Sequence, residues 1–566
     1  MPIPRSLLAR TAPVDHDMRI TQGSWPEGLR GELIISAPDP STLDGPHPFF
    51  GEGLTYRLSL QPGTFGAPSD RFAWRQRVID SPSARLRAKR PDVFEATMIG
   101  VQSPFGVVNS ANTAPLPWGD RLFTTWDVGR PTEIDPVTLG FLGEVGHRDQ
   151  WQPFEVMPQP VLPLIMSTAH PVIDPDRDVM WTVNTLWGQL HVVRWDGEGP
   201  VQWWPIEGAI IPQSVHTITQ TRNWIVVADC AFKVEPQVLS GGERTEPNNY
   251  GGPVYLIRKD ALEATAPGQP VPCSAFELAP EMNHYYGVYD DSDGIQVLFE
   301  HTENSDIAMA QRPGDVDALG RPCDPALMGL YGFPMSPDRT TLVQFDPSTG
   351  KVTHRAESLD PQRLWTRQLN AMDWSTEGMS NPVSHHLVHQ GWRPEAITQR
   401  LLALYGDRVD RTLWPEEETP PLVVTLERQD LTVTSEYELA MDDFPSSPIF
   451  VPRDPDAAGT SRYAGSDPGG HDGWVVVPII NDDGFRVEVF DAGDVGSGPV
   501  ATLAEPGMKV PFILHSAWML RAEPAQDRPR LRFADELARV GELPDDLARV
   551  AHEVAADLDE GVPIGR

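Results

Sequence analysis

The feature that most constrains the fold is a short pattern that recurs seven times along the chain. An apolar strand end runs into a turn containing Asp or Gly, and a second strand follows. The copies are 60 to 88 residues apart and centre on Leu58, Ile134, Arg194, Ile257, Phe345, Leu426 and Phe490. Strand pairs repeated at such intervals are typical of sheets in a closed ring. We therefore expect an all-β, seven-bladed β-propeller, with a pair of large β-sandwiches as the alternative.

The predicted propeller covers residues 20–525. Two segments of the chain depart from the repeated strand–turn–strand pattern. Residues 362–406 carry helical spacing of apolar positions after a proline, which predicts a helical or loop cap inserted there. Residues 526–566 are acidic, with apolar positions at i and i+3 or i+4. They predict a short C-terminal helical extension packed on the body, or alternatively an oligomerisation helix. The polar, Gly-rich residues 453–473 predict a loop.

Composition limits the partners. A net charge of −35 argues against nucleic acid, which requires a basic surface, and against charge-driven docking on anionic lipid. Peripheral membrane contact through an apolar patch stays open. The three cysteines form no disulfide framework, and no run of 18 apolar residues occurs, so we expect a soluble, cytoplasmic protein. The oligomeric state does not follow from the sequence.

Four histidines lie in strand-like settings that suit one metal ion: His170, His216, His284 and His515. Neutral imidazole is a ligand for iron, copper, zinc and nickel. In a propeller the innermost strand of each blade lines the central axis, so one residue from each of four blades can point to the same place. His301 is the rival for the third position.

Several motifs resemble those of the carotenoid cleavage oxygenase family, the retinal pigment epithelial membrane protein-like oxygenases. Thr168-Ala-His170-Pro-Val-Ile-Asp is similar to the family's first ligand motif, and Pro511-Phe-Ile-Leu-His515 to its last. The similarity runs from about residue 20 to 520, and it favours His284 over His301 by its distance to the Gly-Ile-Gln-Val strand. It implies Fe(2+) on four histidines at a propeller axis, O2 as co-substrate, and oxidative cleavage of a C=C bond into carbonyl products.

The resemblance also exposes departures around the ligands. The family supports its histidines with three glutamates, since a metal-bound imidazole normally donates its other N–H to a carboxylate or carbonyl. Here the first position holds Asp127, whose side chain is one methylene shorter than that of glutamate. Either the aspartate moves closer to make the hydrogen bond, or a water molecule bridges the gap. Ser447 replaces the second glutamate. The third is not located, and its region holds His385, His386 and His389 instead.

The implied substrate is an apolar polyene or stilbene-like molecule in an aromatic tunnel, and no catalytic base is required. By adjacency to the motifs, the tunnel residues are expected to be Phe105, Trp126, Tyr285, Tyr286 and Phe512. Family members that cleave stilbenes usually carry Lys at the position of Trp126, so a carotenoid or apocarotenoid is favoured. The alternatives are a stilbenoid-cleaving oxygenase, an alkene isomerase, a Ca²⁺- or Zn²⁺-dependent lactonase or hydrolase, and a non-catalytic propeller that binds an isoprenoid or a protein.

Overall fold

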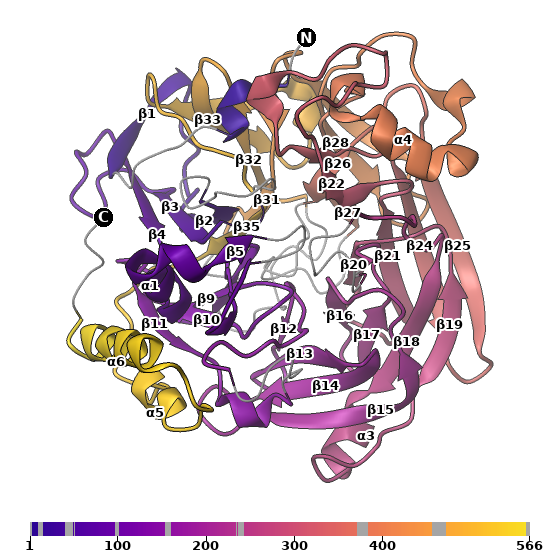
Figure 1. The fold of residues 1–566 in the computed structure, drawn as a ribbon. Helices are drawn as coiled ribbons and strands as arrows, with labels where there is room; N and C mark the ends of the chain where they lie inside the picture. The colour runs from indigo at the N-terminus through magenta and orange to yellow at the C-terminus, as the bar shows by residue number, and fades with distance from the viewer. Residues whose placement is uncertain are drawn as a thin grey trace.

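The chain is a ring of antiparallel sheets around a common centre, the arrangement of a β-propeller (Figure 1). The computed structural model describes residues 3–8, 15–39, 49, 51–96, 101–152, 160–233, 235, 243–370, 383–454 and 471–561. Most of the predicted loop at 453–473 lies outside these residues. No helix in the described ranges combines the length and the apolar character needed to cross a membrane.

Five of the sheets have four strands each. Their strands, sheet by sheet, are β8 (Ala114–Trp118), β9 (Arg121–Thr125), β10 (Thr132–Ile134) and β11 (Phe141–Glu144); β12 (Val172–Asp174), β13 (Val179–Leu186), β14 (Gln189–Trp195) and β15 (Gln202–Ile210); β16 (Ile218–Gln220), β17 (Trp224–Ala228), β18 (Gly252–Arg258) and β19 (Ser274–Leu278); β20 (His284–Gly287), β21 (Ile295–His301), β24 (Arg339–Asp346) and β25 (Lys351–Leu359); and β26 (Arg367–Asn370), β27 (Ser384–His389), β28 (Leu422–Glu427) and β29 (Val433–Glu438).

A ten-stranded sheet joins the two ends of the chain. It contains β1 (His16–Gly23), β2 (Glu32–Pro38), β3 (Gly53–Ser59), β4 (Phe72–Val78), β30 (Phe444–Pro445), β31 (Ile449–Pro452), β32 (Gly473–Asn481), β33 (Gly484–Asp491), β34 (Pro499–Ala504) and β35 (His515–Met519). Strand β1 pairs with β4 over His16–Met18 and with β34 over Arg19–Gly23. Of the seven blades expected, five are separate four-stranded sheets in the described residues, and β1 joins the strands from the two ends of the chain into one larger sheet.

The seven sequence repeats fall on equivalent places in this architecture. Each marks the connection between two antiparallel neighbours: β3–β4, β10–β11, β14–β15, β18–β19, β24–β25, β28–β29 and β33–β34. Five of these pairs lie in the five four-stranded sheets, and two lie in the ten-stranded sheet. The repeated pattern therefore marks hairpins, as predicted.

The structure describes further small sheets and helices outside the four-stranded and ten-stranded sheets. The small sheets are β5 (Glu95–Ala96), β6 (Val101–Ser103) and β7 (Gly106–Val107), and β22 (Asp306–Ala310) with β23 (Tyr331–Gly332). The α-helices are α1 (Pro82–Lys89), α3 (Lys259–Ala264), α4 (Gln399–Tyr405), α5 (Phe533–Leu537) and α6 (Asp545–Asp559). The 3-10 helices are η1 (Arg5–Leu8), η4 (Pro91–Val93), η5 (Arg148–Gln150), η6 (Pro325–Leu327), η7 (Pro394–Ala396), η8 (Gly406–Arg408), η9 (Arg411–Leu413) and η11 (Val495–Ser497).

The predicted cap at 362–406 is helical only in its second part. Its first part contributes β26 and β27 to a four-stranded sheet, where Ser384–His389 is entirely buried. Helix α4 begins after Thr398, whose side chain accepts a hydrogen bond from the backbone of Leu401. The helical spacing therefore identified α4, whereas the strands before it are part of the ring.

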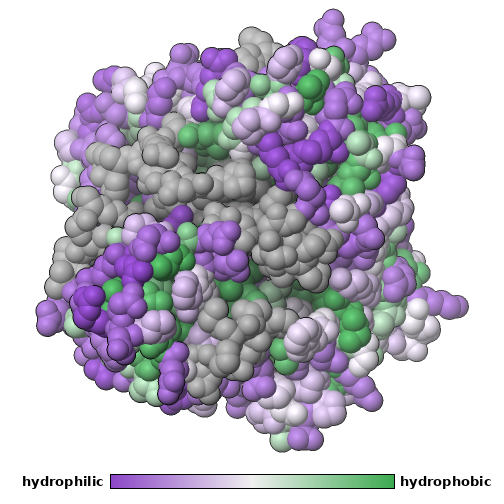
Figure 2. All heavy atoms as spheres, viewed as in Figure 1, coloured by the Kyte–Doolittle hydropathy of each residue, from purple (hydrophilic) through white to green (hydrophobic). Residues whose placement is uncertain are grey.

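The C-terminal extension packs on the body. Leu547, Val550 and Val554 of α6 are buried in the main core cluster, which also contains Leu86 of α1. The carboxylate of Glu536 in α5 accepts hydrogen bonds from the backbone N–H of Arg148 at 3.2 Å and from Arg130 at 3.3 Å. Figure 2 shows hydrophilic side chains over much of the described rim of the ring face, with hydrophobic side chains nearer its centre.

Candidate metal centre

Four inner strands position the four histidines. His284 and His515 are the first residues of β20 and β35, and His170 and His216 lie two residues before β12 and β16. Each of these strands is at the end of the strand order in its sheet, and all four labels surround the centre of the ring in Figure 1. The sheets thus present the histidines to one region, although the residues lie far apart in sequence.

Threonine hydroxyls tie three of the ligand segments together. The Thr168 hydroxyl donates to the carbonyl of His216 at 2.6 Å, and the Thr217 hydroxyl donates to the carbonyl of Asn283 at 2.8 Å. His170 and Thr217 also form a parallel bridge. These bonds fix the segments carrying His170, His216 and His284 against one another. The site is therefore set by the backbone arrangement as well as by the side chains.

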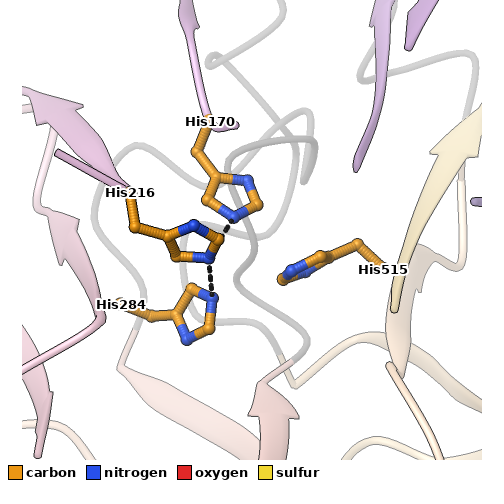
Figure 3. A group of neighbouring side chains, drawn as sticks. All are labelled: His170, His216, His284 and His515. Atoms are coloured by element: carbon orange, nitrogen blue, oxygen red, sulfur yellow. Dashed lines mark hydrogen bonds between the residues drawn. The ribbon is translucent and has the colours of Figure 1, made fainter. Parts of the chain in front are cut away.

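The imidazole rings converge as predicted (Figure 3). One ring nitrogen of each lies within 4.8 Å of those of the others. Nε2 of His216 is 3.2 Å from Nε2 of His170 and 3.2 Å from Nε2 of His284. With metal–nitrogen bonds of about 2.1 Å, adjacent ligands on one ion stand about 3 Å apart. These separations therefore fit a single metal ion.

His301, the alternative for the third position, is not part of the four-histidine cluster among the described residues. Its Nδ1 lies 2.9 Å from the carbonyl of Pro280, and its Nε2 lies 2.8 Å from the hydroxyl of Thr341. His301 follows Glu300 on β21, and alternate residues of a strand face opposite ways. It is a hydrogen-bonded core histidine.

Asp127 reaches a ligand directly, without the bridging water that its short side chain suggested. Its Oδ1 lies 2.8 Å from Nδ1 of His216, and the same oxygen accepts the backbone N–H of Ala169 at 3.2 Å. A hydrogen bond from Nδ1–H leaves the Nε2 lone pair for coordination. Asp127 thus fixes the tautomer of His216 that a metal requires.

Glu300 supports His284, and sequence reasoning did not identify it. The two residues face each other in the β20–β21 hairpin, and Oε2 of Glu300 is 3.6 Å from Nδ1 of His284. The other oxygen of Glu300 is 3.2 Å from Arg367, and both side chains are buried. The signal lay in the register of the hairpin, because β20 and β21 pair so that Glu300, 16 positions after His284, stands opposite it.

The support continues beyond Glu300 as a chain of charges. Arg367 also pairs with Asp338, whose Oδ2 lies 3.0 Å from Nε2 of His389. Burial would raise the pKa of Glu300, but Arg367 and the hydrogen bond from His284 outweigh burial and hold that pKa below its usual value. Two carboxylates beside one guanidinium leave one negative charge near His284, and Asp127 adds a second near His216. This formal charge balances a divalent cation in a buried site.

Ser447 and the three histidines of the 385–389 region take other positions in the structure. The hydroxyl of Ser447 accepts the backbone N–H of Ser516 at 2.8 Å, so it orders the chain beside His515. His385, His386 and His389 are buried on β27, outside the four-histidine cluster. Nδ1 of His386 lies 2.9 Å from the hydroxyl of Thr425.

Burial keeps three of the four clustered histidines neutral. It lowers the pKa of His170 and His515 well below the ordinary value, and neighbouring histidines lower both further. Burial also lowers the pKa of His284, against the opposing effect of Glu300. Since metals bind the deprotonated imidazole, the cluster is ready for a metal ion at neutral pH.

A cavity of about 210 Å³ opens on His216, His284 and His515, while His170 is fully buried behind them. Of the predicted tunnel residues, Trp126 and Phe512 line the cavity. The other three are corrected. Phe105 stacks on Phe94 with ring centroids 6.0 Å apart, and the Tyr285 hydroxyl accepts the backbone N–H of Ala228. Tyr286 packs with Leu298, Leu342 and Leu431.

Further residues complete the cavity wall. The apolar ones that the sequence analysis did not name are Phe49, Val128, Met166, Val215, Phe232, Ile307, Ala308, Tyr331, Pro334 and Leu514. The ring of Phe232 contacts that of His216, with centroids 4.7 Å apart. Val128 and Val215 adjoin the motif residues Asp127 and His216, whereas Phe232 and Tyr331 come from segments that no motif marks.

The chain belongs to the family that this fold and this histidine cluster define. The model of the retinal pigment epithelial membrane protein family matches residues 8–520, nearly the whole length. The protein is therefore an enzyme of the carotenoid cleavage oxygenase family, as its motifs indicated.

Particular relatives span most of the chain at low identity. Apocarotenoid-15,15'-oxygenase of Synechocystis sp. is 22% identical over 532 residues, 89% of this chain and 93% of the relative. Isoeugenol monooxygenase of Pseudomonas putida is 22% identical over 524 residues, 88% and 93% of the two chains. A cobalt-substituted Synechocystis apocarotenoid oxygenase gives a TM-score of 0.60 at 17% identity, with 91% of this chain and 97% of that one covered. Lignostilbene dioxygenase of Pseudomonas brassicacearum gives 0.58 at 15% identity, with 93% and 100% covered.

Proposed function

We propose that the protein is an Fe(2+)-dependent dioxygenase that cleaves a C=C bond of a carotenoid- or apocarotenoid-type polyene into two carbonyl compounds, with O2 as co-substrate. The observation that carries the proposal is the convergence of four imidazoles, three of which border a largely apolar cavity. An all-nitrogen donor set suits iron and argues against Ca²⁺, which prefers oxygen ligands. The Ca²⁺-dependent lactonase or hydrolase is accordingly disfavoured, and metal analysis of the purified protein separates iron from Zn²⁺.

The residues of this chain have separate tasks in that reaction. When bound, ferrous iron supplies the activation of O2, which the side chains alone cannot provide. His216, His284 and His515 border the cavity, so the open side of the cluster faces the substrate. Trp126 and Phe512 hold an apolar alkene beside that side and exclude water. No group is needed to transfer a proton, and we assign no catalytic base.

The test is reconstitution. Protein loaded anaerobically with one Fe(2+) per chain is exposed to O2 with a panel of carotenoids, apocarotenals and stilbenes, and the products are identified by mass. Paired carbonyl products that disappear with His284→Ala support the proposal. Unchanged alkenes with iron-loaded protein contradict it, and an isomerised alkene identifies the isomerase alternative.

Two features bear on the choice between polyene and stilbenoid. Trp126 lines the cavity at the position where the resemblance places Lys in stilbene-cleaving members, which supports the polyene. Lys233 also borders the cavity, and its ammonium is 2.7 Å from Glu246. A cation there could attract a phenolate, and this favours the stilbenoid as the second candidate. The substrate panel separates the two.

We also propose that the ten-stranded sheet acts as two blades, β1–β4 with β35 and β30–β34, so that the propeller has seven. The support is the position of the seven repeats, of which two lie in this sheet.

The protein is proposed to act in the cytoplasm and to contact membranes peripherally. Trp187, in the turn between β13 and β14, is 79% exposed, and Ile210 next to that turn is 49% exposed. Co-flotation with neutral lipid vesicles that is lost with Trp187→Ser would support the contact, and equal flotation of both proteins would contradict it.

A further inference from the structure

One polar group in the cavity wall has no role in the reaction described above. Tyr331 begins the short strand β23, lines the cavity, and is about nine-tenths buried. Its ring lies among those of Phe49, Phe333 and Phe512, with centroids 5.1 to 5.5 Å away. Apart from its hydroxyl, this face of the cavity is aromatic.

The hydroxyl of Tyr331 has no hydrogen-bond partner among the described residues. Other buried tyrosines are satisfied by the protein: Tyr405 donates to Asp306 at 3.0 Å, and Tyr289 donates to Asp174 at 3.1 Å. Tyr56 also lacks a partner in this part of the chain, but it is 0% exposed and closed to any ligand.

Leaving a buried hydroxyl without a partner is costly, so such groups are usually bonded to protein, water or ligand. No charged group acts on Tyr331, and burial alone raises the pKa of its phenol. It therefore stays a neutral O–H that can both donate and accept. Because Tyr331 lines the cavity, a molecule held there is the available partner for its hydroxyl.

We propose that Tyr331 binds an oxygen atom of the substrate, so that the enzyme prefers an alkene bearing a hydroxyl, phenol or carbonyl group to a hydrocarbon of the same shape. This rests on the proposed function, which places the alkene in this cavity. Tyr331 sets specificity and takes no part in bond cleavage. The shared chemistry is one hydrogen bond to oxygen, which a terpenoid alcohol or aldehyde and a phenolic stilbene can both provide.

The test compares two matched pairs of probes: retinol with its deoxy hydrocarbon, and trans-4-hydroxystilbene with trans-stilbene. Binding is measured anaerobically by quenching of tryptophan fluorescence, with wild type, Tyr331→Phe and the control Tyr437→Phe. Tyr437 packs on Phe490 in another sheet and does not line the cavity. Tyr331→Phe removes a single oxygen atom and keeps the ring contacts, so the fold is retained.

In at least one pair, wild type and Tyr437→Phe are expected to bind the oxygenated probe about fivefold more tightly than the hydrocarbon. Tyr331→Phe removes that preference and leaves hydrocarbon binding unchanged. The probe pair that shows the Tyr331-dependent preference identifies the substrate as a terpenoid or as a phenolic stilbene. The inference is overturned if no pair shows a preference, if Tyr331→Phe keeps it, or if none of the four probes binds.

Binding is measured without O2, so its outcome is independent of cleavage. Absence of cleavage products would defeat the proposed function, and loss of the Tyr331-dependent preference would defeat this inference.

Discussion

Nδ1 of His284 lies 3.6 Å from Oε2 of Glu300, its direct partner across the β20–β21 hairpin. One hairpin thus supplies both a ligand and its carboxylate support. Glu300 is held in turn by Arg367, and Arg367 by Asp338. This arrangement provides the anionic partner that the motif comparison could not locate.

Replacing Glu300 with Gln is expected to weaken metal binding by about 10- to 100-fold, because His284 loses an anionic partner that orients the ring and raises its basicity. Metal content after dialysis against graded chelator measures the change. Glu303→Gln is the control: its carboxylate pairs with Arg339 at 3.3 Å and does not line the cavity. If Glu300→Gln and wild type retain the same amount of metal, Glu300 does not support the metal site.

The third ligand can be tested by contrast between two histidines. His284→Ala is expected to lose stoichiometric metal, because one of four converging nitrogens is removed. His301→Gln is expected to keep it, since His301 bonds Pro280 and Thr341 and does not join the cluster. Metal analysis of the two purified variants decides the matter, and the reverse result would restore His301 as the ligand.

The stability of the protein should depend on pH through His301. Burial lowers its pKa to about 4, against 6.5 in the unfolded chain. Between these values the unfolded chain binds a proton that the folded chain does not, so the contribution is present above pH 6.5 and is lost as pH falls towards 4. Each pH unit in this window lowers the free energy of unfolding by about 1.4 kcal/mol.

His301→Gln removes this dependence. The variant should be less stable than wild type at pH 7.5, and the difference should shrink by about 2 kcal/mol at pH 5. Denaturant unfolding of both proteins at the two pH values measures it. Comparing the pair cancels the opposite effect of buried carboxylates such as Glu281, whose pKa is raised to about 7. A constant difference would show that His301 does not titrate as described.

The C-terminal extension should loosen when Glu536 is replaced by Gln. Glu536 is 2% exposed and lies within hydrogen-bonding distance of Arg130, His147 and the backbone of Arg148. Losing its charge is expected to cost about 1–3 kcal/mol of docking free energy. Limited proteolysis after residue 526 should therefore be faster than in wild type and in the exposed control Glu542→Gln. Identical cleavage rates in all three would contradict the anchoring role.

The features that could be predicted from sequence were local ones. The strand and turn pattern around Phe345 or Phe490 predicts a hairpin from neighbouring residues alone. The motif around His170 likewise predicts the strand that begins just after it. Together with the resemblance they predicted the ring and the converging ligands.

The features that could not be predicted depend on pairing between distant or alternating residues. The fused sheet arises because β1 pairs with β34, almost 500 residues later. Tyr285 follows His284 but faces the opposite side of the strand, so adjacency misplaced it in the tunnel. Tyr331 and Phe49 meet in the cavity from segments that share no motif.

The pairing of β2 with β35 places Ser36 opposite His515, so an early strand holds the strand that carries the fourth ligand. The last ligand is therefore in place only when the two ends of the ring have joined. An ion that binds all four histidines would select the closed ring and stabilise it in proportion to its free concentration. The metal would then hold the closed ring together. The coordination that supports chemistry would form only after the chain has finished folding.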